Sequence, residues 1–293
     1  MQTQPRRITI AHSPDSDDAF MFYALAKGLI DTEGLEVVEE LQDIESLNQR
    51  CLRAELDSSA ASVHAYAYFS DRYAVLPCGA SLGEGYGPRV VSREPVEIET
   101  LSGRTVAIPG MLTSAALALR LFLPSFELKL VPFDRILEAV RDGEVDAGLV
   151  IHEGQLTYLR FGLHLVADLG ELWLRRTGLP LPLGVNVVRR DLGEETIRQV
   201  GRLLQRSIEY GLEHRSEALD HAMSHARGLE RRQVDRFVGL YVNDLTRDLG
   251  ERGREAVRRL LEEGHEAGII PRPVAVEFVR LDGSLDGSEV WRG

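Results

Sequence analysis

The chain has 293 residues, of which 44% are hydrophobic and 27% charged, which is enough for two globular domains with real cores. Its net charge of −12 excludes the clustered basic surface that nucleic acids and anionic membranes require. A small anionic ligand stays compatible with this charge, because a cleft in an acidic protein can be locally positive.

Strand and helix patterns alternate in the first part of the chain. Short apolar runs bounded by turn residues predict strands, and apolar residues at helical spacing predict helices. Asp43 stands where the N-cap of the second predicted helix is expected. In chain order, the pattern predicts a strand at 8–11, a polar turn at 12–18, a helix at 19–30, a strand at 35–41, a helix at 44–54 and a strand at 59–63.

The same succession recurs about 90 residues later, with strands at 104–108, 127–131 and 147–151 and helices at 112–122 and 134–141. In both copies an amphipathic helix is followed by Glu-x-Asp, at 55–57 and at 144–146, and then by small residues. Small residues are expected there because the next strand must pack closely beneath the helix. Two β-α-β-α-β units indicate an α/β fold.

The pattern changes after Leu183, where a strand at 184–188 is followed by helices near 194–214, 216–226, 230–245 and 251–264 and an extended tail at 269–278. We therefore expect two lobes, each a mostly parallel sheet flanked by helices. Residues 1–89 and 189–293 would form lobe one, and residues 90–188 lobe two, joined by hinge strands at 89–91 and 185–189. Ligands of open α/β sheets bind beyond the carboxyl ends of the strands, so a cleft between the lobes is the expected binding place.

Candidate site residues follow four predicted strands: the turn 12–18, Ser62, the segment 110–115 and His152. The first helical N–H groups and hydroxyls after Gly110 could bind a carboxylate, or Thr113 or Ser114 is merely an N-cap. His152 ends an apolar strand, where a neutral imidazole could accept a proton, or it is a structural histidine. The Asp-rich turn lacks the spacing of a calcium loop, so its carboxylates are expected to cap the next helix.

Several motifs in these segments occur in a specific order: His12-Ser13-Pro14 with Asp18 and Phe20, Asp43 with Glu45, Leu47 and Asn48, Ser62 with Ala65-Tyr66, Pro109-Gly110 with Thr113-Ser114-Ala115, Ile151-His152-Glu153 with Thr157-Tyr158, Asp168-Leu169-Gly170, and the run from Thr177 to Gly184. Through them, nearly the whole chain resembles the 1,4-dihydroxy-6-naphthoate synthase family of the futalosine route to menaquinone. The resemblance implies a type II periplasmic-binding-protein-like fold and a lyase that converts cyclic dehypoxanthinyl futalosine to 1,4-dihydroxy-6-naphthoate, releasing a sugar fragment. It implies no metal and no organic cofactor.

The family's proposed general base corresponds to His152, and its substrate contacts correspond to Asn48, Ser62, Thr113 or Ser114, and Ala115. The chain departs from the family at Ala60, where many members have lysine, in the Asp-rich first loop, and at Gly154-Gln155 after the Ile-His-Glu motif. These departures concern contacts near the polar groups of the substrate and leave the base untouched.

Three alternatives have the same fold: chorismate dehydratase of the same pathway, a non-catalytic small-anion binding protein, and a cofactor-dependent synthase of the thiamine-precursor type. Two basic residues near the N-terminus precede no long apolar run, and no window approaches the ~20 apolar residues of a membrane span. Cys51 and Cys78 lack metal or redox spacing and are expected to be free thiols. We therefore expect a cytoplasmic monomer or homodimer with a small anionic aromatic carboxylate as its substrate.

Overall fold

The computed structural model describes residues 6–226 and 228–281, which form two compact units. Unit 1 contains the described residues up to Ser81, those of 184–251, and those from Val274 onward. Unit 2 contains Leu82–Leu183 and Arg252–Pro273. The segment 252–273, which the sequence analysis assigned to lobe one, thus lies in unit 2.

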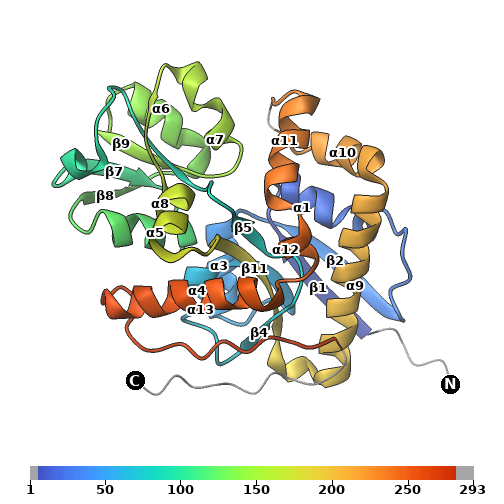
Figure 1. Cartoon of the computed structure of the whole chain (residues 1–293). Coiled ribbons are helices and arrows are strands. Elements are labelled where there is room, and N and C mark those ends of the chain that lie inside the picture. The colour runs from blue at the N-terminus through green and yellow to red at the C-terminus, as the bar shows by residue number, and fades with distance from the viewer. Residues whose placement is uncertain (1–5, 227, 282–293) are drawn as a thin grey trace. The chain divides into compact units, whose positions relative to one another are not determined.

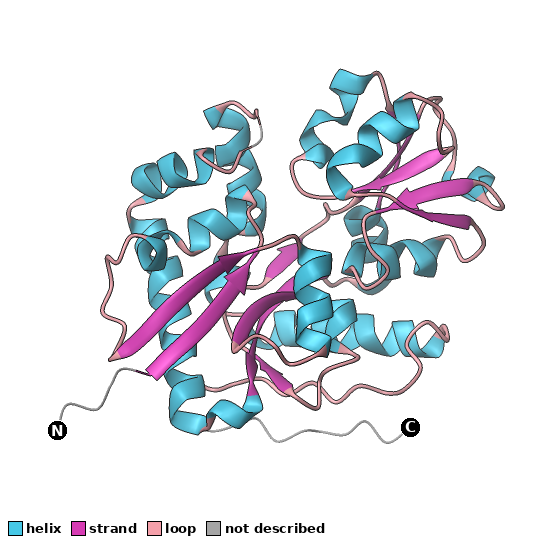
Figure 2. Ribbon diagram, turned by 180° about the vertical axis from the view of Figure 1, so that it is seen from behind, coloured by secondary structure: helices cyan, strands magenta, loops and turns pink. Residues whose placement is uncertain are grey.

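The sheet of unit 1 has the order β2-β1-β3-β11-β4, and β5 also pairs with β11 (Figure 2). Strand β1 runs parallel to β2 and β3, whereas β11 runs antiparallel to β3 and β4. The bounds are Arg6–His12 for β1, Leu35–Leu41 for β2, Ser58–Ser62 for β3, Tyr73–Val75 for β4, Ser81–Gly83 for β5 and Leu181–Arg189 for β11.

The helices of unit 1 are α1 (Ser16–Met21), α2 (Tyr23–Ala26), α3 (Ile44–Leu52), α4 (Val63–Tyr66), α9 (Glu194–Glu213), α10 (Arg215–Met223), α11 (Arg231–Tyr241) and α12 (Asp244–Arg247). Helix α3 begins where predicted, because the Asp43 side chain accepts the Ser46 N–H at 3.0 Å as an N-cap. The core joins β1 to α1, α9, α10 and α11, with Ile10, Phe20 and Leu203 among its buried side chains.

The sheet of unit 2 has the order β10-β6-β9-β7-β8, with α6 and α7 on one face and α5 and α8 on the other (Figure 1). Its strands are β6 (Arg89–Ser92), β7 (Thr105–Ile108), β8 (Glu127–Leu130), β9 (Ala147–Val150) and β10 (His164–Asp168). Its helices are α5 (Ser114–Phe122), α6 (Ile136–Arg141), α7 (Gly154–Thr157) and α8 (Leu169–Thr177), to which α13 (Gly250–Glu266) adds its part from Arg252 onward.

The predicted internal repeat is confirmed by the strand order. The order β2-β1-β3-β11 of unit 1 matches β8-β7-β9-β6 of unit 2, and in each the fourth strand is antiparallel to the third. The sheets are therefore mixed rather than mostly parallel, because β11 pairs antiparallel with β3 and β4 in unit 1, and β6 pairs antiparallel with β9 and β10 in unit 2. At Gly148 of β9, an added Cβ would lie 2.5 Å from the Ile136 side chain and 2.7 Å from the Val140 side chain of α6. The strand therefore needs a small residue here, as the sequence pattern predicts.

The predicted helix at 19–30 consists of two short helices, α1 and α2, and begins three residues earlier, at Ser16. Among the residues that the structure describes, no helix is long and apolar enough to span a bilayer.

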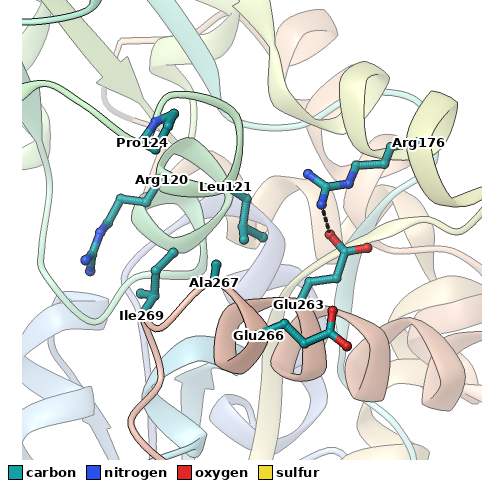
Figure 3. Close-up of a pocket in the computed structure, with 8 residues that line it drawn as sticks. All are labelled: Arg120, Leu121, Pro124, Arg176, Glu263, Glu266, Ala267 and Ile269. Atoms are coloured by element: carbon teal, nitrogen blue, oxygen red, sulfur yellow. Dashed lines mark ion pairs between the residues drawn. The ribbon is translucent and has the colours of Figure 1, made fainter.

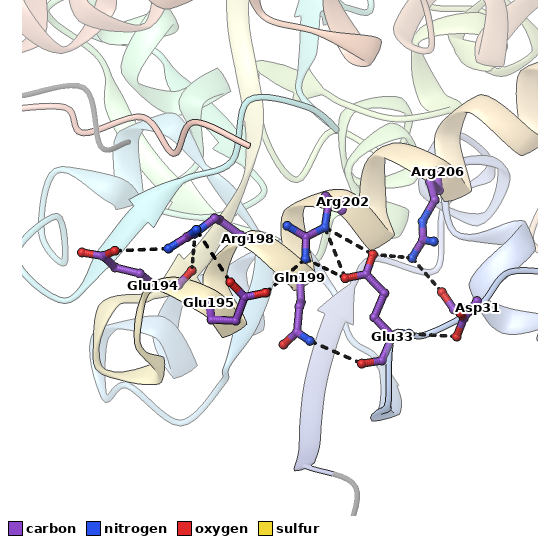
Figure 4. A network of polar contacts seen from close by, with 8 residues as sticks. All are labelled: Asp31, Glu33, Glu194, Glu195, Arg198, Gln199, Arg202 and Arg206. Carbon is purple, nitrogen blue, oxygen red and sulfur yellow. Dashed lines mark hydrogen bonds and ion pairs between the residues drawn. The ribbon is translucent and has the colours of Figure 1, made fainter. Parts of the chain in front are cut away.

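A polar network ties α9 to the loop that precedes β2 (Figure 4). The Glu33 carboxylate pairs with Arg202 at 2.6 Å and with Arg206 at 3.1 Å, and its carbonyl accepts the Gln199 side-chain amide at 3.3 Å. The hydrogen bond from Arg202, followed by the charges of both arginines, lowers the pKa of Glu33.

We predict that Glu33→Gln lowers the free energy of unfolding by about 0.5–1 kcal/mol at pH 7, which is the range of partly exposed ion pairs. Because the folded-state pKa of Glu33 is lowered, its stabilisation is present above the unfolded-state pKa of about 4.3 and is lost as the pH falls through the folded-state value. Urea unfolding of both proteins between pH 7 and pH 3 should show the difference shrinking. Glu36→Gln is the control, because Glu36 is exposed and has no ion pair with a described residue; an E33Q deficit that persists at pH 3 would contradict the assignment.

Candidate functional site

Residues that follow β1 and β3 lie at one edge of the unit 1 sheet, because these parallel strands end on the same side. His12 ends β1, and Ser62 ends β3 and begins α4. The structural repeat gives unit 2 the same arrangement, with the loop before α5 following β7 and the His152 loop following β9. Within each unit, the predicted site residues therefore share one sheet edge.

Asn48 and Ser62 are brought together as a buried pair. The Asn48 side-chain oxygen accepts the Ser62 backbone N–H at 2.9 Å, and its amide nitrogen donates to the Ser62 hydroxyl at 3.0 Å. The hydroxyl oxygen is thereby used as an acceptor, and no described residue accepts its proton. This leaves the Ser62 hydroxyl oriented by Asn48 with its donor available.

We predict that Asn48→Ala destabilises the chain by about 1–3 kcal/mol, because it leaves the buried Ser62 N–H without its acceptor. Urea unfolding monitored by circular dichroism measures this loss. Gln49→Ala, at the exposed neighbour on the same helix, should change stability by less than about 0.5 kcal/mol. Equal unfolding midpoints for N48A and Q49A would show that the pair contributes no stability.

The start of α5 uses both hydroxyls of the predicted carboxylate site within unit 2. The Thr113 hydroxyl accepts the Ala116 N–H at 3.2 Å as the N-cap and donates to the Gly110 carbonyl at 3.0 Å. The Ser114 hydroxyl donates to the Leu183 carbonyl. The N–H group of Ala115 belongs to the first helical turn, which offers it no intrahelical acceptor.

His152 has a left-handed backbone conformation directly after β9, with φ of +52°. This conformation costs a residue with a Cβ roughly 1–2 kcal/mol of conformational free energy, and residues with such strain are concentrated at functional sites. The half-buried imidazole meets the Phe133 ring edge-to-face at 5.2 Å, and the neighbouring Glu153 is buried. His152 therefore lies in a strained turn at the sheet edge that also carries the start of α5.

Gly154, one of the departures from the family pattern, has a packing reason. An added Cβ would lie 2.4 Å from the Val150 side chain, so the valine at the end of β9 and the glycine at the start of α7 fit each other. A serine at this position would require Val150 to shift.

The Asp-rich first loop is buried, and its role differs from the predicted one. Asp15 occupies the N-cap position of α1 without a side-chain capping bond. Instead, the Asp18 carboxylate accepts the N–H of Ser13 at 2.9 Å and lies 2.9 Å from its hydroxyl. Burial raises the pKa of Asp18, and the charge of His12 opposes this rise.

His12 has an acceptor at each ring nitrogen. Nδ1 lies 2.9 Å from the Ser13 carbonyl, and Nε2 lies 2.6 Å from the Glu39 carboxylate. His12 thus links this loop to Glu39 of β2. Composition showed that the loop is acidic, but no sequence signal showed that His12 would contact Glu39.

The two cysteines are not among the predicted site residues. Cys51 and Cys78 are buried free thiols, and burial raises the pKa of Cys51 to about 12 and that of Cys78 further still. Within residues 6–226 and 228–281, no group of three His, Cys, Asp or Glu side chains is placed to hold a metal ion.

Unit 2 also has a pocket of about 390 Å³ between α5, α8 and α13 (Figure 3). Arg176 and Glu263 form an ion pair of 2.7 Å across it, and Arg259 also bonds Glu263 at 3.0 Å. The buried Glu263 carboxylate is thereby neutralised. None of the predicted site residues lines this pocket, whose lining consists of Arg120, Leu121, Pro124, Arg176, Glu263, Glu266, Ala267 and Ile269.

Residues 8–266 match the family model described as menaquinone biosynthesis. The chain is 44% identical over 273 residues to the 1,4-dihydroxy-6-naphthoate synthase of Thermus thermophilus, covering 92% of this chain and 99% of that protein. It is 40% identical over 280 residues to the enzyme of the same name from Streptomyces coelicolor, covering 92% and 98%.

Solved structures agree with the predicted fold class. A crystal structure of a protein from Archaeoglobus fulgidus has a TM-score of 0.87 and 45% identity, over 90% of this chain and 98% of that one. The alkanesulfonate-binding protein of Xanthomonas axonopodis pv. citri, bound to MOPS, has a TM-score of 0.70 at 14% identity, over 93% and 96%. The second likeness shows the fold alone and confirms the periplasmic-binding-protein-like architecture. From the family match and the two curated relatives, the chain belongs to the menaquinone biosynthesis family.

Proposed function

We propose that this chain is a 1,4-dihydroxy-6-naphthoate synthase that converts cyclic dehypoxanthinyl futalosine to 1,4-dihydroxy-6-naphthoate. The observation that carries the proposal is identity of 40–44% to two enzymes of that name over nearly their full lengths. The proposal places the reaction in the cytoplasm, where the thiols of Cys51 and Cys78 stay reduced.

His152 is assigned the role of general base. Its position at the sheet edge and its strained backbone support this role, because strain at a turn that aims one side chain is typical of functional residues. The imidazole takes a proton from the substrate, and the electron pair left behind drives cleavage of the carbon–carbon bond to the sugar fragment. The ring becomes aromatic in this step, which supplies much of the driving force.

The substrate carboxylate is assigned to the start of α5. Since Thr113 and Ser114 use their hydroxyls within unit 2, the proposed donor is the N–H group of Ala115, and the positive end of the helix dipole favours an anion there. Asn48 and Ser62 of unit 1 are assigned to a polar group of the substrate, with the Ser62 hydroxyl as donor.

The test is incubation of the purified chain with cyclic dehypoxanthinyl futalosine, followed by mass spectrometry and the absorbance of the naphthoate. The proposal predicts naphthoate together with a sugar fragment. Consumption of chorismate instead would assign the chain to chorismate dehydratase. Binding of the substrate with its mass unchanged would assign a non-catalytic binding protein.

A further inference from the structure

The segment that carries His152 leaves the sheet at the end of β9 and returns to it as β10. Both strands pair with β6, which lies between them. In the register of these pairs, Arg89 at the start of β6 faces Val150 on one side and Asp168 on the other. Arg89 therefore lies between the last residue of β9 and the last residue of β10.

The side chain of Arg89 contacts the segment between β9 and β10 at two places and the end of β10 at a third. Its Nη1 donates to the Gln155 carbonyl at 2.8 Å, its guanidinium carbon lies 5.7 Å from the centre of the Tyr158 ring, and its Nε pairs with the Asp168 carboxylate at 3.2 Å. Gln155 and Tyr158 are three and six residues beyond His152, on the turn that follows it. Arg89 thus contacts the turn that follows His152 at the Gln155 carbonyl and at the Tyr158 ring.

Asp168 fixes the direction of the guanidinium. Its other carboxylate oxygen accepts the N–H groups of Gly170 at 3.1 Å and Glu171 at 3.3 Å as the N-cap of α8. The Asp168 side chain is only 8% exposed, and a movement of its carboxylate would break these hydrogen bonds. Burial raises the pKa of Asp168, whereas the charge of Arg89 and its hydrogen bond lower it.

A lysine cannot replace these contacts, because an ammonium group lacks the planar fork that reaches a carboxylate and a carbonyl in fixed directions. The bond to the Gln155 carbonyl is the contact closest in sequence to His152, and its loss would let the turn move. Misplacement of a catalytic group by about 1 Å can cost about 10²-fold in rate.

We infer that Arg89 is a positioning residue for His152, acting through Gln155 and Tyr158 and itself held by Asp168. The inference rests on the proposed role of His152 as the general base. Arg89 touches neither the imidazole nor any reacting atom in this account, and its effect is on where the imidazole lies.

The test compares Arg89→Lys and Arg89→Met with Arg93→Lys. Arg93 is the matched control, because its Nη1 also donates to two main-chain carbonyls of unit 2, but these belong to Val140 in the last turn of α6 and to Val145 before β9, whereas His152 follows β9. We expect kcat to fall at least 10-fold in R89K and R89M, with KM changed less than about threefold, and R93K to keep the kcat of the parent chain. R89K keeps a positive charge beside Asp168, so its melting temperature should stay within a few degrees of the parent.

A structural role alone would lower the melting temperature of R89K and leave the kcat of its folded fraction unchanged, and that result would overturn the inference. Hydrogen exchange gives a readout independent of turnover: peptides covering 151–161 should exchange faster in R89K, and those covering α6 should not. A chain that forms no naphthoate overturns the proposed function, whereas normal kcat in R89K beside an inactive His152→Ala variant overturns only the inference about Arg89.

Discussion

Replacing His152 by glycine is expected to reduce turnover about 10²–10⁴-fold, which is the usual contribution of a positioned general base. The same substitution should raise the free energy of unfolding by up to about 1 kcal/mol, because glycine adopts φ of +52° without the steric cost that a side chain pays. Loss of activity with a gain of stability separates a functional histidine from a structural one, whose removal would destabilise the fold. Initial rates of naphthoate formation and urea unfolding measure the two effects.

Ala54→Gly is the matched control for this prediction. Ala54 follows α3 with φ of +54°, so glycine should relieve the same backbone strain there. This variant should gain similar stability and keep its full turnover. A His152→Gly variant that loses stability while it keeps its turnover would show that His152 has a structural role and is not the base.

Gly170→Ala is expected to destabilise unit 2 by about 3 kcal/mol or more. Its Cβ would lie 1.9 Å from the Tyr86 carbonyl oxygen and 2.1 Å from the carbonyl carbon, and both are backbone atoms that cannot rotate away. Overpacking that forces the backbone to move costs about 1–3 kcal/mol, and contact this close lies at the upper end or beyond it. Thermal or urea unfolding measures the loss.

Gly239→Ala on α11 provides the comparison. Its nearest neighbour would be the Arg215 side chain at 3.7 Å, an ordinary contact, and alanine is favoured over glycine inside a helix by about 0.5–1 kcal/mol. This variant should unfold at a higher urea concentration than the parent. If both alanine variants shifted the midpoint equally, the close approach of the 83–87 loop to α8 would not contribute to stability.

Much of the fold follows from the sequence because its elements have strong local signals. The strand at 35–41 and the helix that begins at Ile44 are observed where the pattern predicts them, and the Asp43 cap explains the second. Helix α8 and strand β10 escaped prediction, since His164–Asp168 is short and half exposed and its role depends on pairing with the distant β6. Segment 252–273 joins unit 2 through tertiary contacts, such as the pair of Arg176 with Glu263, that no local pattern encodes.

The candidate site was predictable as a set of positions after strands, but its internal bonding was not. The sequence indicated Asn48 and Ser62 separately, and the structure joins them through two hydrogen bonds. Thr113 was open to capping or binding, and its hydroxyl bonds both the Gly110 carbonyl and the Ala116 N–H. Arg89 gave no signal, because an arginine in a predicted hinge strand reveals its partners only when the strands on both sides are known.

The most direct test of the role assigned to His152 compares the binding and the conversion of the substrate by two proteins. Cyclic dehypoxanthinyl futalosine is titrated into the parent chain and into His152→Gly in a calorimeter, and each mixture is then analysed by mass spectrometry. We expect both proteins to bind the substrate, the parent chain to form naphthoate, and the variant to leave the substrate unchanged. Naphthoate in equal amounts from both would contradict the assignment of His152 as the base.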